Sequence, residues 1–157
     1  MNKILFGALA GIVATVPMTL LMIEWHKRLP PEEKYPLPPR EIFDELTEKA
    51  GVDGHLSETE KINLAIIGHF AYGAANGAVY APLVSLVQTP NPVNGVVYGL
   101  GIWTASYLGW LPALHILRSA DQHPAQRNAL MITAHIVWGG TLGFAVGQMI
   151  KADRKKN

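Results

Sequence analysis

Two histidines at equivalent positions of an internal repeat are the residues most able to carry chemistry in this sequence. Residues 61–77 align with residues 127–143 at an offset of 66. In each copy a basic residue is followed eight positions later by a histidine, His69 or His135, and then by an aromatic residue and two glycines. A neutral imidazole both donates and accepts a hydrogen bond, and it can also ligate a metal. The repeat therefore predicts a pair of histidines at matching depth in two helices.

The first interpretation of the histidine pair is structural. Neutral histidines inside a helical bundle hydrogen-bond to neighbouring helices. We expect their partners to come from four polar side chains: Tyr72, Asn76, Thr133 and Thr15. Tyr72 and Asn76 would then form a polar core with the two histidines. Because an imidazole N–H that faces hydrocarbon has no partner, we expect both rings to face the protein interior.

A second interpretation makes His69 and His135 the axial ligands of a buried haem. Gly73 and Gly139 each follow one turn after a histidine, where they would leave space for the macrocycle. The basic residues that begin the two copies of the repeat would meet the haem propionates: Lys61 and Arg127. This interpretation predicts a redox subunit.

A third interpretation is a path for protons or a small solute, in which the histidines join Tyr72, Asn76 and Glu24. The sequence contains no carboxylate pair, nucleophile with a neighbouring base, phosphate-binding loop or cluster with metal-ligand spacing. It also has no cysteine, which excludes a disulfide framework, a thiolate metal site and a cysteine nucleophile. We therefore name no catalytic or metal-ligating residue and expect a protein that is not an enzyme.

The distribution of charge indicates where the histidines lie. The chain of 157 residues has a net charge of +1, and 16% of its residues are charged, against roughly 25% in soluble domains. Of the 25 charged residues, 15 lie between residues 27 and 61, and only three fall among the 89 residues from 62 to 150. Such uncharged stretches indicate a membrane protein. The balanced charge argues against binding to nucleic acid.

Four segments are long and apolar enough to cross a bilayer, which takes about 20 residues. They cover residues 4–25, 62–87, 93–117 and 128–150. The first is too long for the apolar core of a signal peptide, so we expect it to be retained. The short connections after the second and third segments make neighbouring helices antiparallel. We expect an all-α, integral membrane four-helix bundle that forms one domain over residues 1–157.

Pairs of glycines four residues apart occur in all four expected spans. The pairs in the repeat are Gly73 with Gly77 and Gly139 with Gly143, and the other spans carry Gly7 with Gly11 and Gly95 with Gly99. Lipid provides little hydrophobic drive between helices, so small residues stabilise a bundle by letting the backbones approach closely. We expect these glycines to pack helix against helix.

The long polar loop covers residues 26–61. Within it, residues 39–50 have the pattern of a short amphipathic helix that would lie at the membrane interface or cap the bundle. Ser57 and Glu60 have the spacing of a capping box, which predicts a helix N-cap at Ser57, immediately ahead of the second span.

Two charged residues of this region are candidates for specific contacts. Arg40 follows two prolines on a stiff segment, which suits its guanidinium to a bidentate contact with a carboxylate or a lipid phosphate. Glu24 lies near the end of the first span, where we expect it either to join an interfacial ion cluster or to pair with Arg40.

The motif Tyr35-Pro-Leu-Pro-Pro-Arg40-Glu41-Ile42 resembles the YagU-like family of uncharacterised bacterial inner-membrane proteins. The glycine-rich first span and His135-Ile-Val-Trp138 in the last span extend the resemblance over most of the chain. The resemblance implies a multi-pass protein of the bacterial inner membrane and implies no reaction or catalytic residue.

Our leading interpretation is a non-enzymatic membrane bundle that acts as a subunit or scaffold of a larger inner-membrane assembly. Its partners would be the lipid bilayer and other membrane subunits or further copies of the chain. The alternatives are a haem-binding redox subunit and a small proton or solute transporter.

Overall fold

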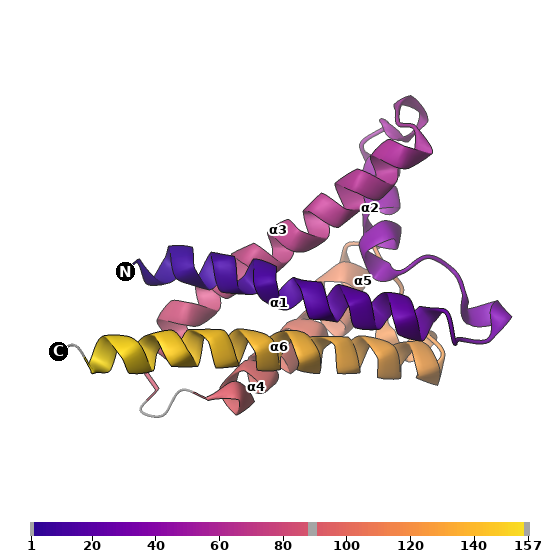
Figure 1. The fold of residues 1–157 in the computed structure, drawn as a ribbon. Helices are drawn as coiled ribbons and strands as arrows, with labels where there is room; N and C mark the ends of the chain where they lie inside the picture. The colour runs from indigo at the N-terminus through magenta and orange to yellow at the C-terminus, as the bar shows by residue number, and fades with distance from the viewer. Residues whose placement is uncertain (1, 88–90, 156–157) are drawn as a thin grey trace.

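The computed structural model describes residues 2–87 and 91–155, and within these ranges every regular element is helical (Figure 1). This confirms the all-helical prediction. The longer helices are α1 (Lys3–His26), α2 (Pro38–Lys49), α3 (Glu58–Val84), α4 (Pro92–Ala105) and α6 (Ala125–Arg154). Single helical turns occur at Pro31–Glu33, Asp53–His55, Leu111–Ala113 (α5) and Ala120–Gln122.

Two helices, α1 and α6, are long and apolar enough to cross a membrane among the residues that the structure describes. The start of α1 and the end of α6 lie at the same end of the molecule (Figure 1). The helix α3 starts where the sequence predicts, because the Ser57 hydroxyl accepts from the Glu60 amide and the Glu60 carboxylate accepts from the Ser57 amide. Each bond satisfies an amide that has no partner within the helix.

The third expected span is interrupted instead of forming one continuous helix over residues 93–117. The helix α4 ends at Ala105 and is followed by a wide π-type turn, Ser106–Trp110, and then by α5. Gly109 has φ −116° and ψ −107°, far from helical values. Pro112 lacks the amide that would continue the ladder of hydrogen bonds. Within the wide turn Ser106 and Tyr107 are buried against the rest of the protein, whereas Leu108 and Trp110 are exposed.

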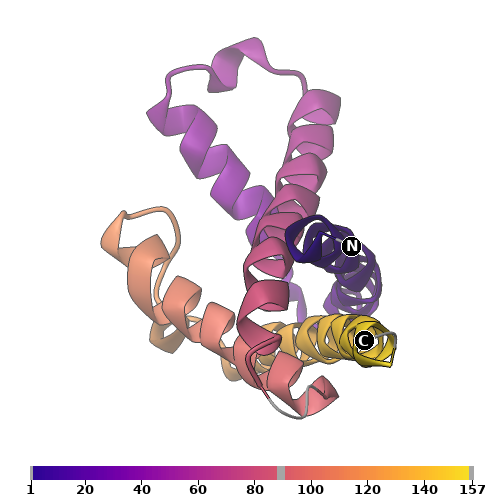
Figure 2. The ribbon, with the colours of Figure 1, turned by 90° about the vertical axis from the view of Figure 1, so that its left-hand side faces the viewer.

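The long helices pack as two pairs, α1 with α3 and α4 with α6, which are joined by contacts between α1 and α6. The helices α3 and α4 contact each other sparsely, and the first half of α3 leans away from the rest (Figures 1 and 2). The expected four segments therefore do not close into one regular bundle in this structure.

Glycines lie at the closest approaches within both helix pairs. Between α1 and α3, a Cβ atom on Gly7 would collide with the carbonyl oxygen of Gly77, and one on Gly11 would collide with that of Gly73. Backbone also meets backbone between α4 and α6, at Gly95, Gly99, Gly139 and Gly143. The two pairs thus use the same kind of contact, with the repeated segments in α3 and α6.

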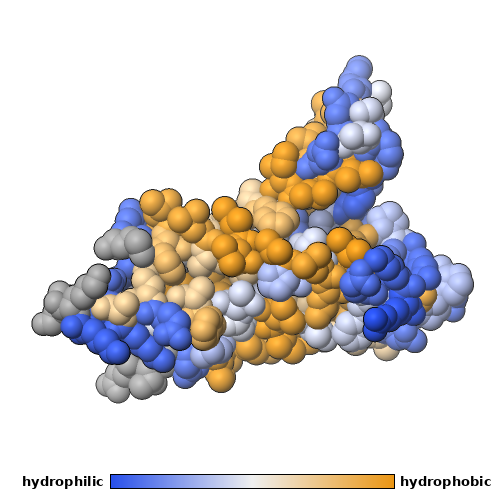
Figure 3. Space-filling model, viewed as in Figure 1, coloured by the Kyte–Doolittle hydropathy of each residue, from blue (hydrophilic) through white to orange (hydrophobic). Residues whose placement is uncertain are grey.

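Large apolar side chains remain exposed along the outer faces of the helices. They include Leu5, Leu9, Val13 and Leu20 on α1, Ile66, Ile67 and Val79 on α3, and Phe144 on α6. Figure 3 shows apolar surface along the middle of the molecule and hydrophilic surface towards its ends. This pattern is the one expected of a protein surrounded by hydrocarbon.

Candidate functional site

His69 and His135 face one cavity, which we call the histidine cavity. Its volume is about 290 Å³, and its walls come from α1, α2, α3, the end of α4, the wide turn Ser106–Trp110, α5 and α6. The polar and aromatic side chains that define it include Thr15, His69, Tyr72, Tyr107, Trp110 and His135. The sequence repeat therefore brings its two histidines to the same place in the fold.

His135 is buried, and its ring orientation is fixed from within its own helix. Its Nδ1 atom lies 2.8 Å from the carbonyl oxygen of Met131. A carbonyl only accepts, so Nδ1 must carry the proton, and in the neutral ring Nε2 is then an acceptor. The Tyr107 ring packs edge-on against the imidazole, with 6.0 Å between centroids. His135 is therefore rigid and offers one lone pair.

His69 has a buried ring nitrogen without a partner. Its Nε2 atom makes no hydrogen bond to any residue that the structure describes. An imidazole nitrogen that is removed from water without a hydrogen bond is unfavourable by about 1–3 kcal/mol. This atom is the clearest unsatisfied polar group in the cavity wall.

The hydrogen-bond partners predicted for the histidines from the sequence are wrong. The Tyr72 hydroxyl lies 3.2 Å from the Ser106 hydroxyl, and Asn76 Nδ2 donates to the Tyr72 carbonyl at 2.9 Å. The hydroxyls of Thr15 and Thr133 donate to carbonyls one turn earlier in their own helices. Threonine hydroxyls in helices often donate locally in this way, so these protons are not available to the histidines.

Sequence reasoning missed most of the apolar wall of the cavity. Tyr107 and Trp110 belong to the wide turn, which the periodicity of the third segment does not show. Trp138, in α6, donates from Nε1 to the Thr15 hydroxyl at 3.2 Å. Gly109 and Pro112, close together in an apolar stretch, were the available signal for the interruption.

The cavity does not fit the haem interpretation. The space expected beside Gly73 is filled by Thr15, and that beside Gly139 by the backbone of Gly95. A cavity of about 150 Å³ holds one benzene, so about 290 Å³ holds a substituted ring and not a porphyrin of four linked pyrroles. The residues assigned to the propionates are otherwise engaged, Lys61 with Asp53 and Arg127 with the long loop. The residues around the cavity therefore do not fit a haem.

The polar path also lacks its carboxylate. Glu24 lies outside the cavity wall and forms an exposed ion pair with Lys27, whose Nζ is 2.5 Å away. The expected alternative pair of Glu24 with Arg40 does not form, because Arg40 contacts Asp44 and Glu58 instead. Glu24 is therefore paired with Lys27 and not with Arg40, and its place at a membrane interface stays a prediction.

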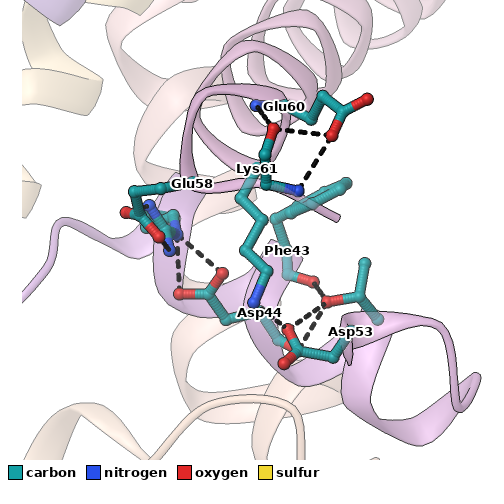
Figure 4. Close-up of polar contacts among 9 residues, drawn as sticks. Phe43, Asp44, Asp53, Glu58, Glu60 and Lys61 are labelled. Carbon is teal, nitrogen blue, oxygen red and sulfur yellow. Dashed lines mark hydrogen bonds and ion pairs between the residues drawn. The ribbon is translucent and has the colours of Figure 1, made fainter. Parts of the chain in front are cut away.

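Arg40 fastens α2 to the first turn of α3. Its Nη1 and Nη2 atoms donate to the two carboxylate oxygens of Glu58 at 2.6 and 3.1 Å, and its Nε donates to Asp44 at 2.6 Å. Nearby, Lys61 reaches across to Asp53 at 2.6 Å (Figure 4). The hydrogen bond from Arg40 lowers the pKa of Glu58, and that from Lys61 lowers the pKa of Asp53.

These contacts hold α2 over the histidine cavity. The apolar face of α2 lines the cavity through Pro38, Pro39, Ile42, Phe43 and Leu46. The helix predicted over residues 39–50 thus covers a cavity in this structure. A change in the Arg40 contacts would therefore alter the cover of the cavity.

We expect Arg40→Lys to loosen α2 without unfolding the protein. Lysine keeps the charge but cannot contact Asp44 and both oxygens of Glu58 at once. Hydrogen exchange of the α2 amides should become severalfold faster, while exchange in α1 and α6 stays unchanged. Lys49→Gln is the control, because it removes an ion pair within α2, at 2.8 Å from Glu45, that does not join two elements. Unchanged exchange in α2 would contradict the role given to Arg40.

Arg127 is buried at the start of α6 and organises the long loop. Its guanidinium donates to the carbonyl oxygens of Glu33, Tyr35 and Pro36 at 2.8–3.1 Å and to the Glu41 carboxylate at 3.3 Å. The Tyr35 ring stacks on it, 3.5 Å from Cζ to the ring centroid. Burial raises the pKa of Glu41 despite the neighbouring cation. The loop is thus tied to the start of α6.

The same loop is closed by a second contact. The Tyr35 hydroxyl lies 2.7 Å from Nδ1 of His123, and Nε2 of His123 lies 3.2 Å from the Arg118 carbonyl. Because Nε2 donates to that carbonyl, Nδ1 accepts from the tyrosine. Burial lowers the pKa of His123, so the neutral ring is favoured there.

A comparison with known protein families identifies the family of this chain. The model of DUF1440, described as a family of proteins of unknown function, matches residues 7–144. This region contains both histidines, Arg127 and most of both helix pairs. No curated protein and no solved structure matches the chain significantly. Because the family model matches most of its length, the chain belongs to the DUF1440 family of proteins of unknown function.

Proposed function

We propose that this protein is a non-enzymatic, multi-pass protein of the bacterial inner membrane that binds a small lipid-soluble molecule in the histidine cavity. The length and apolar character of α1 and α6, the exposed apolar side chains and the YagU-like motif around Arg40 support the membrane location. The helix α3 and the helical run from Pro92 to Ala113 would supply the other two crossings.

The observation that carries the proposal is the unpartnered Nε2 of His69 in the wall of a mostly apolar cavity. A ligand with a matching polar atom would satisfy this nitrogen after a turn of the imidazole ring, since Nε2 has almost no accessible surface in the empty cavity, and it would cover apolar surface at the same time. Pockets of this composition, with few polar groups in an apolar wall, are typical of small-molecule sites.

The bilayer is the source of the ligand in this proposal. The cavity is partly open, and α3 and α4 make few contacts with each other. A molecule dissolved in the hydrocarbon would enter between these two helices, while α2 covers the cavity from the polar loop. This route from the bilayer into the cavity does not depend on a charged group of the protein.

We expect Gly68→Leu to abolish ligand binding while the protein stays folded. Gly68 lines the cavity, and a Cβ atom there would meet nothing within 4 Å, so leucine would occupy the cavity without displacing backbone. The probe is 4-bromotoluene, whose bromine quenches tryptophan fluorescence on contact, and Trp110 and Trp138 report from the wall. The protein is held in lipid nanodiscs.

Gly101→Leu is the matched control, because a Cβ atom there also meets nothing within 4 Å and the residue lies outside the cavity wall. We expect saturable quenching in the wild type and in Gly101→Leu, and only the non-saturable quenching of lipid-dissolved probe in Gly68→Leu. Saturable quenching of equal affinity in all three proteins would exclude the cavity as the binding site.

A role as a subunit of a larger assembly is the second candidate. It is favoured by the divergence of α3, which leaves apolar residues of its first half exposed: Ile62, Leu64, Ile66 and Ile67. Native mass spectrometry of the protein extracted gently from its own membrane tests this role. A strictly monomeric protein without bound partners would exclude it.

A further inference from the structure

We infer that the ligand is a planar ring with two hydroxyl groups, of the class of a benzoquinol head group. This inference rests on the proposed ligand-binding function and adds the chemical class of the ligand. It follows from three properties of the histidine cavity: the hydrogen-bonding character of its two histidines, the absence of charge from its wall, and the shape of its apolar lining.

The tautomer of His135 requires a hydrogen-bond donor from the ligand. Its Nδ1–H is engaged by the Met131 carbonyl, so Nε2 presents a lone pair and no proton. Carbonyl and ether oxygens cannot donate, and they would leave this lone pair unmatched. A hydroxyl group of the ligand satisfies it.

His69 supplies a second polar contact from a different wall. It lies on α3 at the position of the repeat that His135 occupies on α6, and its Nε2 is buried without a partner among the residues described. A hydroxyl both donates and accepts, so it matches His69 in either tautomer. Two histidines on separate helices therefore suit a ring that carries hydroxyl groups at two positions.

The rest of the wall requires a neutral and mostly apolar ligand. None of the described residues that line the cavity is Asp, Glu, Lys or Arg. A carboxylate or phosphate of the ligand would therefore be buried without a counter-ion, which is strongly unfavourable. This excludes fatty acids and phospholipid head groups from the deep part of the cavity.

The size and lining of the cavity favour an aromatic ring. Its volume of about 290 Å³ is roughly twice the 150 Å³ that holds a benzene, which leaves space for several substituents. Tyr72, Tyr107, Trp110 and Trp138 all contribute to the wall. Flat side chains of this kind pack well against a flat ring. An alkyl chain on the ring would pass through the open side into the bilayer.

Displacement of 4-bromotoluene from the wild-type protein in nanodiscs tests the ligand class. The competitors are a decyl-substituted benzoquinol, its dimethyl ether, and decylbenzene. All three have an apolar chain and one ring, but only the first can donate a hydrogen bond. We expect the quinol to displace the probe at roughly tenfold lower concentration than either other compound, since one good hydrogen bond corresponds to about tenfold in affinity.

Variants of the two histidines test whether the tighter binding of the quinol depends on the ring nitrogens of His69 and His135. His135→Phe and His69→Phe keep a ring of similar size, and each should weaken quinol binding about fivefold to tenfold while leaving decylbenzene unchanged. His55→Phe is the control, because His55 is exposed in the loop and does not line the cavity. If either cavity variant fails to fold, the comparison of the three competitors on the wild type decides.

The outcomes separate this inference from the proposed function. Equal displacement by quinol, ether and decylbenzene would overturn the quinol class and leave an apolar ligand site. Failure of 4-bromotoluene to quench saturably would overturn the proposed function itself. Quinol binding that is unaffected by both histidine variants would also overturn the inference, since it would place the hydroxyl groups elsewhere.

Discussion

Replacing Gly139 with leucine is expected to destabilise the protein severely. A Cβ atom at Gly139 would collide with the carbonyl oxygen of Gly95 and approach the backbone of Val96 to 3.1 Å, so α4 and α6 would have to separate. Overpacking of a tight contact is unfavourable by about 1–3 kcal/mol, and by more where backbone must move. We expect a loss of at least about 3 kcal/mol, or roughly 10 °C in the melting temperature of the detergent-solubilised protein.

Two further variants show whether the contact is specific. Gly101→Leu should have little effect, because a Cβ atom there meets nothing within 4 Å. The loss of stability in Gly73→Leu should lie between those of Gly139→Leu and Gly101→Leu. The first atom that a Cβ at Gly73 would meet is the side-chain oxygen of Thr15 and not a backbone atom. Equal losses of stability in the three leucine variants would show that the effect of leucine does not depend on contact between helices.

Replacing Arg127 with methionine is expected to release the long loop and destabilise the protein by about 3–5 kcal/mol. Methionine fills part of the space but donates no hydrogen bond. The carbonyls of Glu33 and Pro36 and the partly buried carboxylate of Glu41 would then lose this donor, and the carbonyl of Tyr35 would keep only its contact with Nε2 of His26. Thermal unfolding in detergent measures the loss, and limited proteolysis should cut between α1 and α2.

Arg118→Met is the matched control for Arg127. Arg118 also lies over the Tyr35 ring, 5.3 Å from its centroid, but its side chain is exposed. Its removal should change stability by less than about 1 kcal/mol. The loss of stability in Arg127→Lys should lie between those of Arg127→Met and Arg118→Met. An ammonium group keeps the charge, but it lacks the planar set of donors that lets a guanidinium contact all of these carbonyls at once. A similar stability for both methionine variants would contradict the role of Arg127.

The Arg127 contacts also bear on the histidine cavity. They fix the loop that leads into α2, and α2 supplies Pro38, Ile42 and Phe43 to the cavity wall. Loss of Arg127 should therefore weaken saturable quenching by 4-bromotoluene even at temperatures where the helices remain folded. The loop motif and the repeat, which lie far apart in the sequence, thus contribute to one site.

Most of the helices, and the equivalent positions of the two histidines, could be predicted from the sequence. Runs of apolar residues longer than about 20 define α1 and α6, and the side chains of Ser57 and Glu60 define the start of α3, because these signals act within one element. The repeat places His69 and His135 at equivalent points of two helices. Their common cavity is consistent with that placement.

The partners of the polar side chains could not be predicted. Tyr72 and the threonines have several acceptors within reach. Each alternative hydrogen bond contributes about 1 kcal/mol, so which one forms depends on the positions of the neighbouring helices. Arg127 looked like the basic start of a span, yet its acceptors are mostly backbone carbonyls, which every residue carries and no sequence pattern marks.

The sequence by itself determined the helical elements, the glycines that allow close approach and the two histidines, because hydrophobic length, capping and small size are local properties. The tertiary structure decided the interruption at Gly109, the cover of the cavity by α2, the burial of Arg127 and the exclusion of haem. Each of these depends on which atoms fill the space beside a residue. That space is shared by helices distant in the chain, so its size and polarity are set only when the helices pack.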